Sequence, residues 1–526
     1  MRIYSVIFIV LFGLIPFHLI AKDGTTELDS LVRIDELDFS SDFEKQMFSS
    51  LFFDNENAFE LLMTINSTAT PKSVAMDKNM LNNELNLLRQ IAIPKKKKAK
   101  YIKEIYNRVH DRFLKKYELE NYFSSIFSEG DYNCVSACLL YSIVFEELGI
   151  PYDIKETPTH VYLIVNYPGE EILIETTDPV GGFSKFSQSF QNSFVKNLAD
   201  SKLIGEQEFI NKTTEAIFEE YYFTKGALSL KELVALQYSN DGLFQIDESN
   251  FYKSISAFQK SYMLYPTERA KSQILYALAS QMQLEEHTDL KGTKILAILS
   301  RYDEVDVKNN ELRNGFIGIT QAMLTNRGDY VLYDSAHNYL VKNIPRQDFK
   351  VEMNYIYNYE RGRILYNRAN YTEALPFLEE AFAIKPNNAD IEPLFLSCLG
   401  MTLQGNRNNE EILNRLRYLM NKFESLAKNN KFGGLFLNAH LIEMANMYES
   451  NRTSAGEYHK EEFEKIANEK PMYQFEESLV GRAYSQLAVY HFRRGHYKSA
   501  RSAINRGLEF APNSYELNNR KKVMSY

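Results

Sequence analysis

Residues 130–179 read GDYNCVSACLLYSIVFEELGIPYDIKETPTHVYLIVNYPGEEILIETTDP, and this stretch decides the fold of the first half of the chain. Its opening run places Cys134 where a loop gives way to an apolar segment, 134–148. Gly149 and Pro151 end that segment. An apolar segment of this length between a loop and a glycine is typical of a buried helix that begins at the cysteine.

A β-hairpin follows the predicted helix. Two runs rich in Val, Ile, Tyr and Thr, at 160–167 and 171–177, predict strands. Pro168 and Gly169 between them are typical of a turn, because proline presets the first central residue and glycine accepts the positive φ of the second. A helix that leads into an antiparallel hairpin predicts an α+β domain, which we place at 75–228.

The same stretch contains the groups of an activated-cysteine site. Cys134 lies at the predicted helix start, His160 in the first strand and Glu175 in the second, with Asp178 just beyond it. A free thiol is a weak nucleophile, and the N-terminus of a helix and a nearby imidazolium both lower a thiol pKa. This order of groups therefore predicts nucleophilic cysteine chemistry.

The register of the hairpin decides between the two candidate acids. If 167–170 is the turn, His160 lies opposite Thr177, and Glu175 points to the same face of the sheet as His160. Asp178 then points to the opposite face. This register favours Glu175 as the group that orients the imidazole, whereas a bulge or a different turn would favour Asp178.

The sequence leaves the oxyanion donor open. The backbone amide of Cys134 is one candidate, and the side chains of Asn133 and Tyr132 are the others. No cysteines and histidines have the spacing of metal ligands. The sequence therefore predicts neither a metal site nor a cofactor.

The stretch 130–179 resembles the core of the transglutaminase-like superfamily, and most of all a bacterial branch in which this domain often precedes tetratricopeptide repeats. The resemblance covers about residues 100–230, and Asn-Cys-Val-Ser and Ile-Glu-Thr-Thr are its most specific runs. It implies a papain-like α+β fold in which Cys134 is the nucleophile, His160 the base and Glu175 the acid. Authentic transglutaminases often use tryptophan at the oxyanion, and this chain has none. The resemblance therefore favours hydrolysis over cross-linking.

From about residue 229 the strand signals end and a helical repeat begins. The last copy, at 483–512, reads AYSQLAVYHFRRGHYKSARSAINRGLEFAP, and its register recurs in stretches that end at Pro386 and Pro266. In all three copies a glycine or alanine of the first helix precedes a small residue of the second helix by twelve positions. The pattern resembles the tetratricopeptide repeat, in which small residues let antiparallel helices approach. It predicts an all-α solenoid of six or seven helix pairs at 229–526.

The N-terminal residues predict export. Residues 3–21 carry no Asp, Glu, Lys or Arg and lie between Arg2 and Lys22. A basic start and an apolar stretch describe a signal peptide, 1–21, and we expect a periplasmic or secreted protein. The stretch is also just long enough to span a bilayer, so an uncleaved N-terminal membrane anchor is the alternative. Residues 22–74 then form a polar segment with helical periodicity in its second half.

Composition limits the classes of partner. A chain of 526 residues with 44% hydrophobic content is long enough for two or three folded domains. A net charge of −9 argues against a nucleic-acid partner. Three cysteines cannot build a disulfide framework, and Cys134 and Cys138, four apart on one helix, lie too far apart to be bridged.

Two functions of different classes follow. In the first, the Cys134 thiolate attacks an amide, His160 protonates the leaving amine, and water or another amine resolves the thioester. The repeats then recruit the protein or peptide substrate, since stacked repeats present extended surfaces. In the second, the transglutaminase-like domain is catalytically silent, and the repeats form a scaffold for protein–protein interaction.

Overall fold

The structure is a computed structural model. In it the chain forms two compact units. The first comprises residues 1–286 and 294–305, and the second comprises 287–293 and 306–526. The predicted signal peptide and Asp178 lie outside the described residues. These run from 31 to 523, except for 66–67, 92–97, 158–159, 168–169, 178–182, 185–190, 193–194, 197, 200–203, 206–210, 224–225, 303–310, 387 and 405–408.

The first unit contains an antiparallel sheet in the order β3-β4-β5-β6. Leu163 lies opposite Ile174 and Tyr167 lies opposite Glu170, which confirms the predicted hairpin register. Sequence periodicity predicted the two central strands and missed the two edge strands. The strands are β3 (Tyr152–Glu156), β4 (Val161–Tyr167), β5 (Glu170–Ile174) and β6 (Phe183–Ser184).

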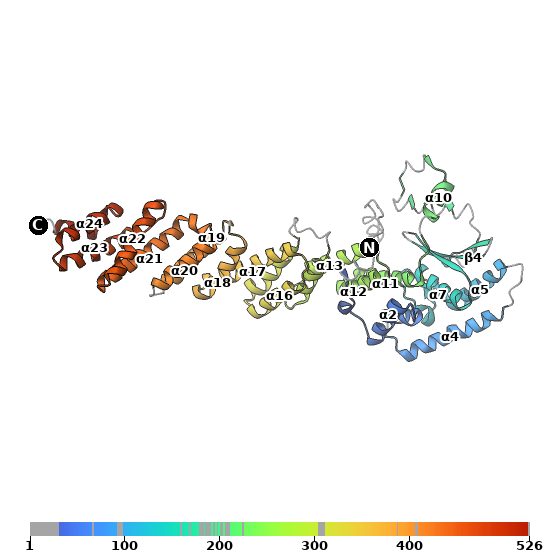
Figure 1. The fold of residues 1–526 in the computed structure, drawn as a ribbon. Coiled ribbons are helices and arrows are strands. Elements are labelled where there is room, and N and C mark those ends of the chain that lie inside the picture. Colours follow the sequence, from blue (N-terminus) through green and yellow to red (C-terminus); the bar gives the residue numbers. More distant parts are fainter. Residues whose placement is uncertain are drawn as a thin grey trace, which may run out of the picture. The chain divides into compact units, whose positions relative to one another are not determined.

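The sheet packs against helix α7 (Cys134–Glu147), which begins at the predicted residue (Figure 1). Residues 135–142 are all buried, because a helix that is apolar all round has to be covered on every side. On another side, the hydroxyl of Tyr141 donates to the Tyr106 carbonyl at 2.9 Å, which ties α7 to α5 (Lys98–Phe113).

Helix α11 (Leu230–Asp247) also packs against α7, although the sequence pattern assigns it to the repeat region. Its Gln237 side chain is buried and donates to the backbone carbonyl of Asn121 at 3.2 Å. Residues 229–286 accordingly belong to the first compact unit. The sequence pattern placed the boundary between domains at 228, before this helix.

The N-terminal segment is part of the first unit as well. Helices α2 (Asp42–Asp54) and α3 (Ala58–Thr64) confirm the helical periodicity there. Glu44 of α2 is buried, pairs with Lys260 at 2.8 Å and accepts from the Tyr238 hydroxyl at 3.0 Å. The remaining elements of this part of the chain are η2 (Ile34–Glu36), α4 (Pro71–Arg89), β1 (Lys116–Tyr117), α6 (Ser125–Ser128), β2 (Asp131–Tyr132) and α10 (Thr214–Phe223).

From residue 230 on, the described residues contain seven consecutive pairs of helices and a final helix, in agreement with the predicted repeat (Figure 1). After α11 come α12 (Phe251–Leu264), α13 (Glu268–Leu284), α14 (Lys291–Leu299), α15 (Glu311–Ile319) with the π-helical turn η3 (Thr320–Asn326), α16 (Tyr330–Asn343), α17 (Gln347–Asn367), α18 (Tyr371–Ile384), α19 (Ile391–Gln404), α20 (Asn409–Lys422), η4 (Leu426–Lys428), α21 (Asn430–Glu449), α22 (Thr453–Glu469), α23 (Glu477–Arg493), α24 (Tyr497–Phe510) and α25 (Tyr515–Val523).

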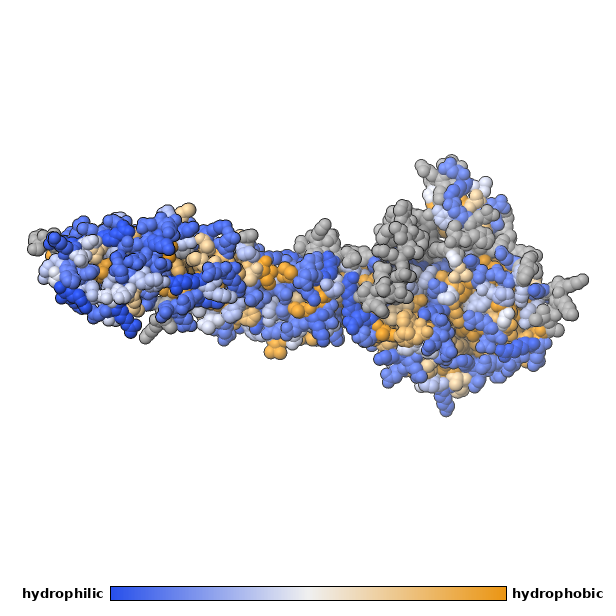
Figure 2. Space-filling model, viewed as in Figure 1, coloured by the Kyte–Doolittle hydropathy of each residue, from blue (hydrophilic) through white to orange (hydrophobic). Residues whose placement is uncertain are grey.

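Small residues bring the paired helices together, as the repeat register predicts. A methyl group on Gly242 would lie 2.4 Å from the Phe258 ring, and one on Gly362 would lie 2.6 Å from Cδ2 of Leu378. Where the first copy has Ser254 in place of alanine, the hydroxyl donates to the Gly242 carbonyl at 2.9 Å. Apolar groups therefore meet between helices, while the visible face of the helices from α16 to α24 is mostly hydrophilic (Figure 2).

We expect Gly362→Ala to lower the free energy of unfolding of the second unit by about 1–3 kcal/mol, because the added carbon forces α17 and α18 apart. Gly400→Ala on α19 is the matched control. Its added carbon meets nothing within 4 Å, so the better helix propensity of alanine should raise stability by up to about 1 kcal/mol. Urea denaturation followed by circular dichroism compares the two, and equal stability changes would contradict the packing argument.

Candidate active site

A glycine with positive φ fixes the loop that leads into α7. Gly130 has a φ of +82°, and a methyl group there would lie 2.4 Å from Cγ of Lys115. The Lys115 amide donates to the Gly130 carbonyl at 2.7 Å. Directly beyond these residues β1 pairs with β2 in parallel, with Tyr117 opposite Tyr132. These contacts fix the path of the chain up to Tyr132, which lies two residues before Cys134 at the start of α7.

Asn133 caps the helix that carries the cysteine. Its Oδ1 accepts from the Ser136 amide at 2.9 Å, and Oγ of Ser136 accepts from the Asn133 amide at 2.9 Å. Its Nδ2 donates to the carbonyls of Leu119 at 3.1 Å and Asn121 at 3.3 Å. Both amide hydrogens of the Asn133 side chain are used in this way. The side chain has none left for an oxyanion.

The other two candidates for the oxyanion donor are the Tyr132 side chain and the backbone amide of Cys134. Tyr132 is buried, and its hydroxyl lies 3.4 Å from Nε2 of His110 on α5. The backbone amide of Cys134 is one of the first-turn N–H groups for which a helix has no internal acceptor. Of the three candidates, this amide fits the role best.

Cys134 and Cys138 lie in different environments on the same helix. Cys134 is partly exposed, whereas Cys138 is fully buried. The Cys138 sulfur donates to the Val161 carbonyl at 3.4 Å and lies 3.5 Å from the Thr176 hydroxyl. Burial raises the pKa of Cys138 well above its usual range. All three cysteines are free thiols. Of the two on α7, Cys134 is the one with access to solvent.

The predicted histidine and one predicted acid meet beside this thiol. Nε2 of His160 lies 2.7 Å from Oε2 of Glu175, as the hairpin register predicts. The other oxygen of Glu175 accepts from the amide of Thr177 at 3.1 Å and from its hydroxyl at 2.7 Å. The Thr157 amide donates to the His160 carbonyl at 2.8 Å. The imidazole and the carboxylate are 30% and 19% exposed, so the pair is held in place and yet remains accessible to solvent.

The charges of the three groups are coupled. Burial alone would disfavour the imidazolium, but hydrogen bonds with Cys134 and Glu175 outweigh it and raise the pKa of His160 to about 10. Burial likewise opposes the charge of Glu175, but the contact with His160 prevails and lowers the pKa of Glu175. At neutral pH the site therefore holds an imidazolium between a carboxylate and a sulfur. Because Nε2 faces the carboxylate, Nδ1 is the nitrogen left for the thiol.

Two tyrosines at this site had no signal in the sequence pattern. Tyr117 is 45% exposed, and its pKa is raised by burial and by the nearby Cys134 and Glu175. The Tyr106 hydroxyl donates to the Glu175 carbonyl at 3.0 Å. Tyr117 comes from a strand of two residues, which is too short to show alternation. Tyr106 comes from a helix distant in the chain, and only the tertiary fold brings it here.

In the part of the chain that the structure describes, no group of three or more His, Cys, Asp and Glu side chains could hold a metal ion. No helix among the described residues has both the length and the apolar character needed to cross a bilayer.

The helical region contains a segment with a family match. Residues 361–385, at the end of α17 and along α18, match the tetratricopeptide repeat model. This segment belongs to the predicted copy that ends at Pro386. Tetratricopeptide repeats generally mediate protein–protein interaction. No curated protein matches the chain.

We expect Glu175→Gln to lower the pKa of His160 from about 10, because the charge of Glu175 then no longer opposes the effect of burial, while the hydrogen bond with Cys134 remains. Glu171→Gln makes the same change at an exposed position of β5, which ends just before Glu175, and should leave the pKa of His160 unaltered. NMR titration of the His160 ring measures both. If the two variants shifted His160 equally, the 2.7 Å contact would not be the cause.

The same contact sets a pH window for stability. The folded pKa of His160 is higher than that of an ordinary histidine, so the ion pair contributes its full stabilisation below about pH 6.5. That contribution is lost as the pH rises through about 10. The wild-type protein should therefore lose more stability than Glu175→Gln between these two values, as thermal unfolding would measure.

Proposed function

We propose that the chain is an exported cysteine-dependent amide hydrolase of the transglutaminase-like type. On this proposal the helical repeats recruit its protein or peptide substrate. The observation that supports it is the Nε2–Oε2 contact of 2.7 Å between His160 and Glu175, beside the partly exposed thiol of Cys134. Nucleophile, base and orienting acid come from a helix start and a β-hairpin. That is the arrangement the resemblance implies.

In the acylation step the Cys134 sulfur attacks the carbonyl carbon of the amide. The negative charge that develops on the carbonyl oxygen is stabilised by the backbone amide of Cys134. The His160 imidazolium gives its proton to the leaving nitrogen, the C–N bond breaks, and an amine leaves. The product is a thioester on Cys134 with a neutral imidazole beside it.

Water then completes the reaction. His160 takes a proton from water as the water oxygen attacks the thioester carbonyl, the C–S bond breaks, and the acid leaves. Glu175 keeps the ring oriented and stabilises it whenever it is charged. An amine in place of water would give transamidation. We propose hydrolysis, because the chain has no tryptophan of the kind that transglutaminases use to line the substrate channel.

A second candidate is a scaffold whose cysteine domain is silent. The family match at 361–385 favours it, since protein–protein interaction is the general role of tetratricopeptide repeats. The commitment of the Asn133 side chain to the helix cap favours it too, because it leaves the oxyanion to a single identified donor. On both candidates the partner is a protein or a peptide. We propose that residues 1–21 direct either one out of the cytoplasm.

Iodoacetamide separates the two candidates. For the enzyme, Cys134 should be alkylated at least about tenfold faster than Cys138 at neutral pH, because Cys134 is partly exposed beside the His160 imidazolium, whereas Cys138 is fully buried and burial raises its pKa. His160→Ala should remove most of that difference. Cys398, buried in the helical region, serves as an internal control in the same mass-spectrometric measurement. Equal and slow alkylation of all three thiols would leave only the scaffold.

A further inference from the structure

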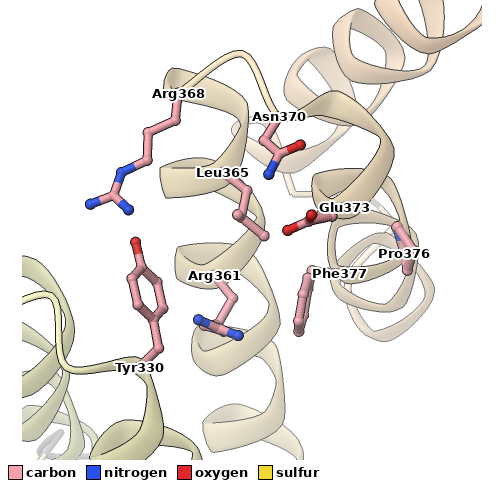
Figure 3. A pocket seen from close by; sticks show the side chains of 8 residues that line it. All are labelled: Tyr330, Arg361, Leu365, Arg368, Asn370, Glu373, Pro376 and Phe377. Carbon is pink, nitrogen blue, oxygen red and sulfur yellow. The ribbon is translucent and has the colours of Figure 1, made fainter.

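The second unit contains a pocket between α16, α17 and α18 that no step above uses (Figure 3). Its volume is about 480 Å³. Except for Tyr330, its lining residues all lie within the matched segment 361–385. The lining side chains that matter for its chemistry are Tyr330, Arg361, Leu365, Arg368, Glu373 and Phe377.

Two guanidinium groups flank one aromatic ring in this pocket. The Arg361 carbon Cζ lies 4.6 Å from the centre of the Tyr330 ring, and that of Arg368 lies 5.3 Å from it. Figure 3 shows the Tyr330 hydroxyl pointing toward the Arg368 guanidinium. Cation–π contacts hold both arginines in place without neutralising them. This end of the pocket therefore concentrates positive charge and hydrogen-bond donors.

Several of these donors have no acceptor. The Tyr330 hydroxyl and Nε of Arg361 are buried and have no hydrogen-bond partner in the structure. Arg361 reaches Asp334 through Nη2 alone, at 3.4 Å. Among the described residues, no carboxylate lies within 4 Å of the Arg368 guanidinium. Since a buried donor without a partner is costly, an acceptor from outside would stabilise the Tyr330 hydroxyl and Nε of Arg361.

We propose that this pocket binds an acidic side chain of an extended peptide segment from a partner protein. The carboxylate lies between Arg368 and the Tyr330 hydroxyl, where charge-assisted hydrogen bonds satisfy the open donors. The methylene groups of the ligand lie against Leu365 and Phe377. Glu373 lies on the opposite side of Leu365 from Arg368 (Figure 3), and it accepts a backbone N–H of the same peptide.

The two ends of the pocket favour a peptide over a small free anion. Inorganic phosphate would use only the positive end and would be repelled by the Glu373 carboxylate. A peptide supplies an acceptor for the arginine end and a donor for the glutamate end. The inference does not rest on the cysteine site, and it would hold for the enzyme and for the scaffold alike.

The test is isothermal titration of the full chain with an end-capped peptide of four glutamates and with its four-glutamine counterpart. The glutamate peptide should bind at least about tenfold more tightly, because only it carries carboxylates. Arg368→Gln should weaken its binding by about tenfold, and Tyr330→Phe should weaken it several-fold. Arg368 is exposed, so its replacement leaves the fold intact, which circular dichroism verifies.

Arg493→Gln is the matched control, since it removes the same charge from an exposed position at the end of α23. It should leave the affinity for the glutamate peptide unchanged. Equal binding of the two peptides, no binding of either, or an equal loss in Arg493→Gln would overturn the proposal. So would displacement of the glutamate peptide by an equal concentration of inorganic phosphate, because the pocket would then bind small anions in general.

Discussion

Helix α7 depends on being covered from every side, and this requirement organises the first unit. A sheet, helix α5 and helix α11 each cover part of it, since residues 135–142 offer no polar face to water. Its two ends reach the surface, and Cys134 is the first residue of one of them. The strand that brings His160 to this end is one of those that cover the helix. The need to bury an apolar helix thus places the thiol beside the imidazole.

Sequence patterns predicted the parts of the site that local chemistry determines. The start of α7, the Pro-Gly hairpin and the pairing of His160 with Glu175 all follow from periodicity and turn residues. The role of Asn133 was open in the sequence, although Asn-x-x-Ser before an apolar run is a cap signal. The place of Tyr117 at the site and the packing of α11 against α7 could not be predicted in this way. Both depend on contacts between residues distant in the chain, and such contacts leave no local periodicity in the sequence.

The cysteine site of the first unit and the pocket of the second unit differ in how their polar groups are satisfied. In the first unit, each buried charge has its partners: Glu44 has a lysine and a tyrosine, and Glu175 has a histidine and a threonine. Such satisfaction makes these groups rigid and holds the His160–Glu175 pair in place. In the pocket of the second unit, the Tyr330 hydroxyl and Arg361 Nε have none. At the His160–Glu175 site the polar groups are satisfied from within the chain, whereas in this pocket two donors are left for an acceptor from a ligand.

The hydrogen bond from Gln237 to the Asn121 carbonyl bears on how this protein could have evolved. Asn121 also contacts the cap of α7, so a helix that belongs by sequence to the repeat array helps to hold the start of the cysteine helix. Genetic recombination at residue 228 would strip that helix away and leave apolar surface on α7 bare. Exchange of whole modules at this point would therefore cost stability in the first unit, because α11 covers part of α7.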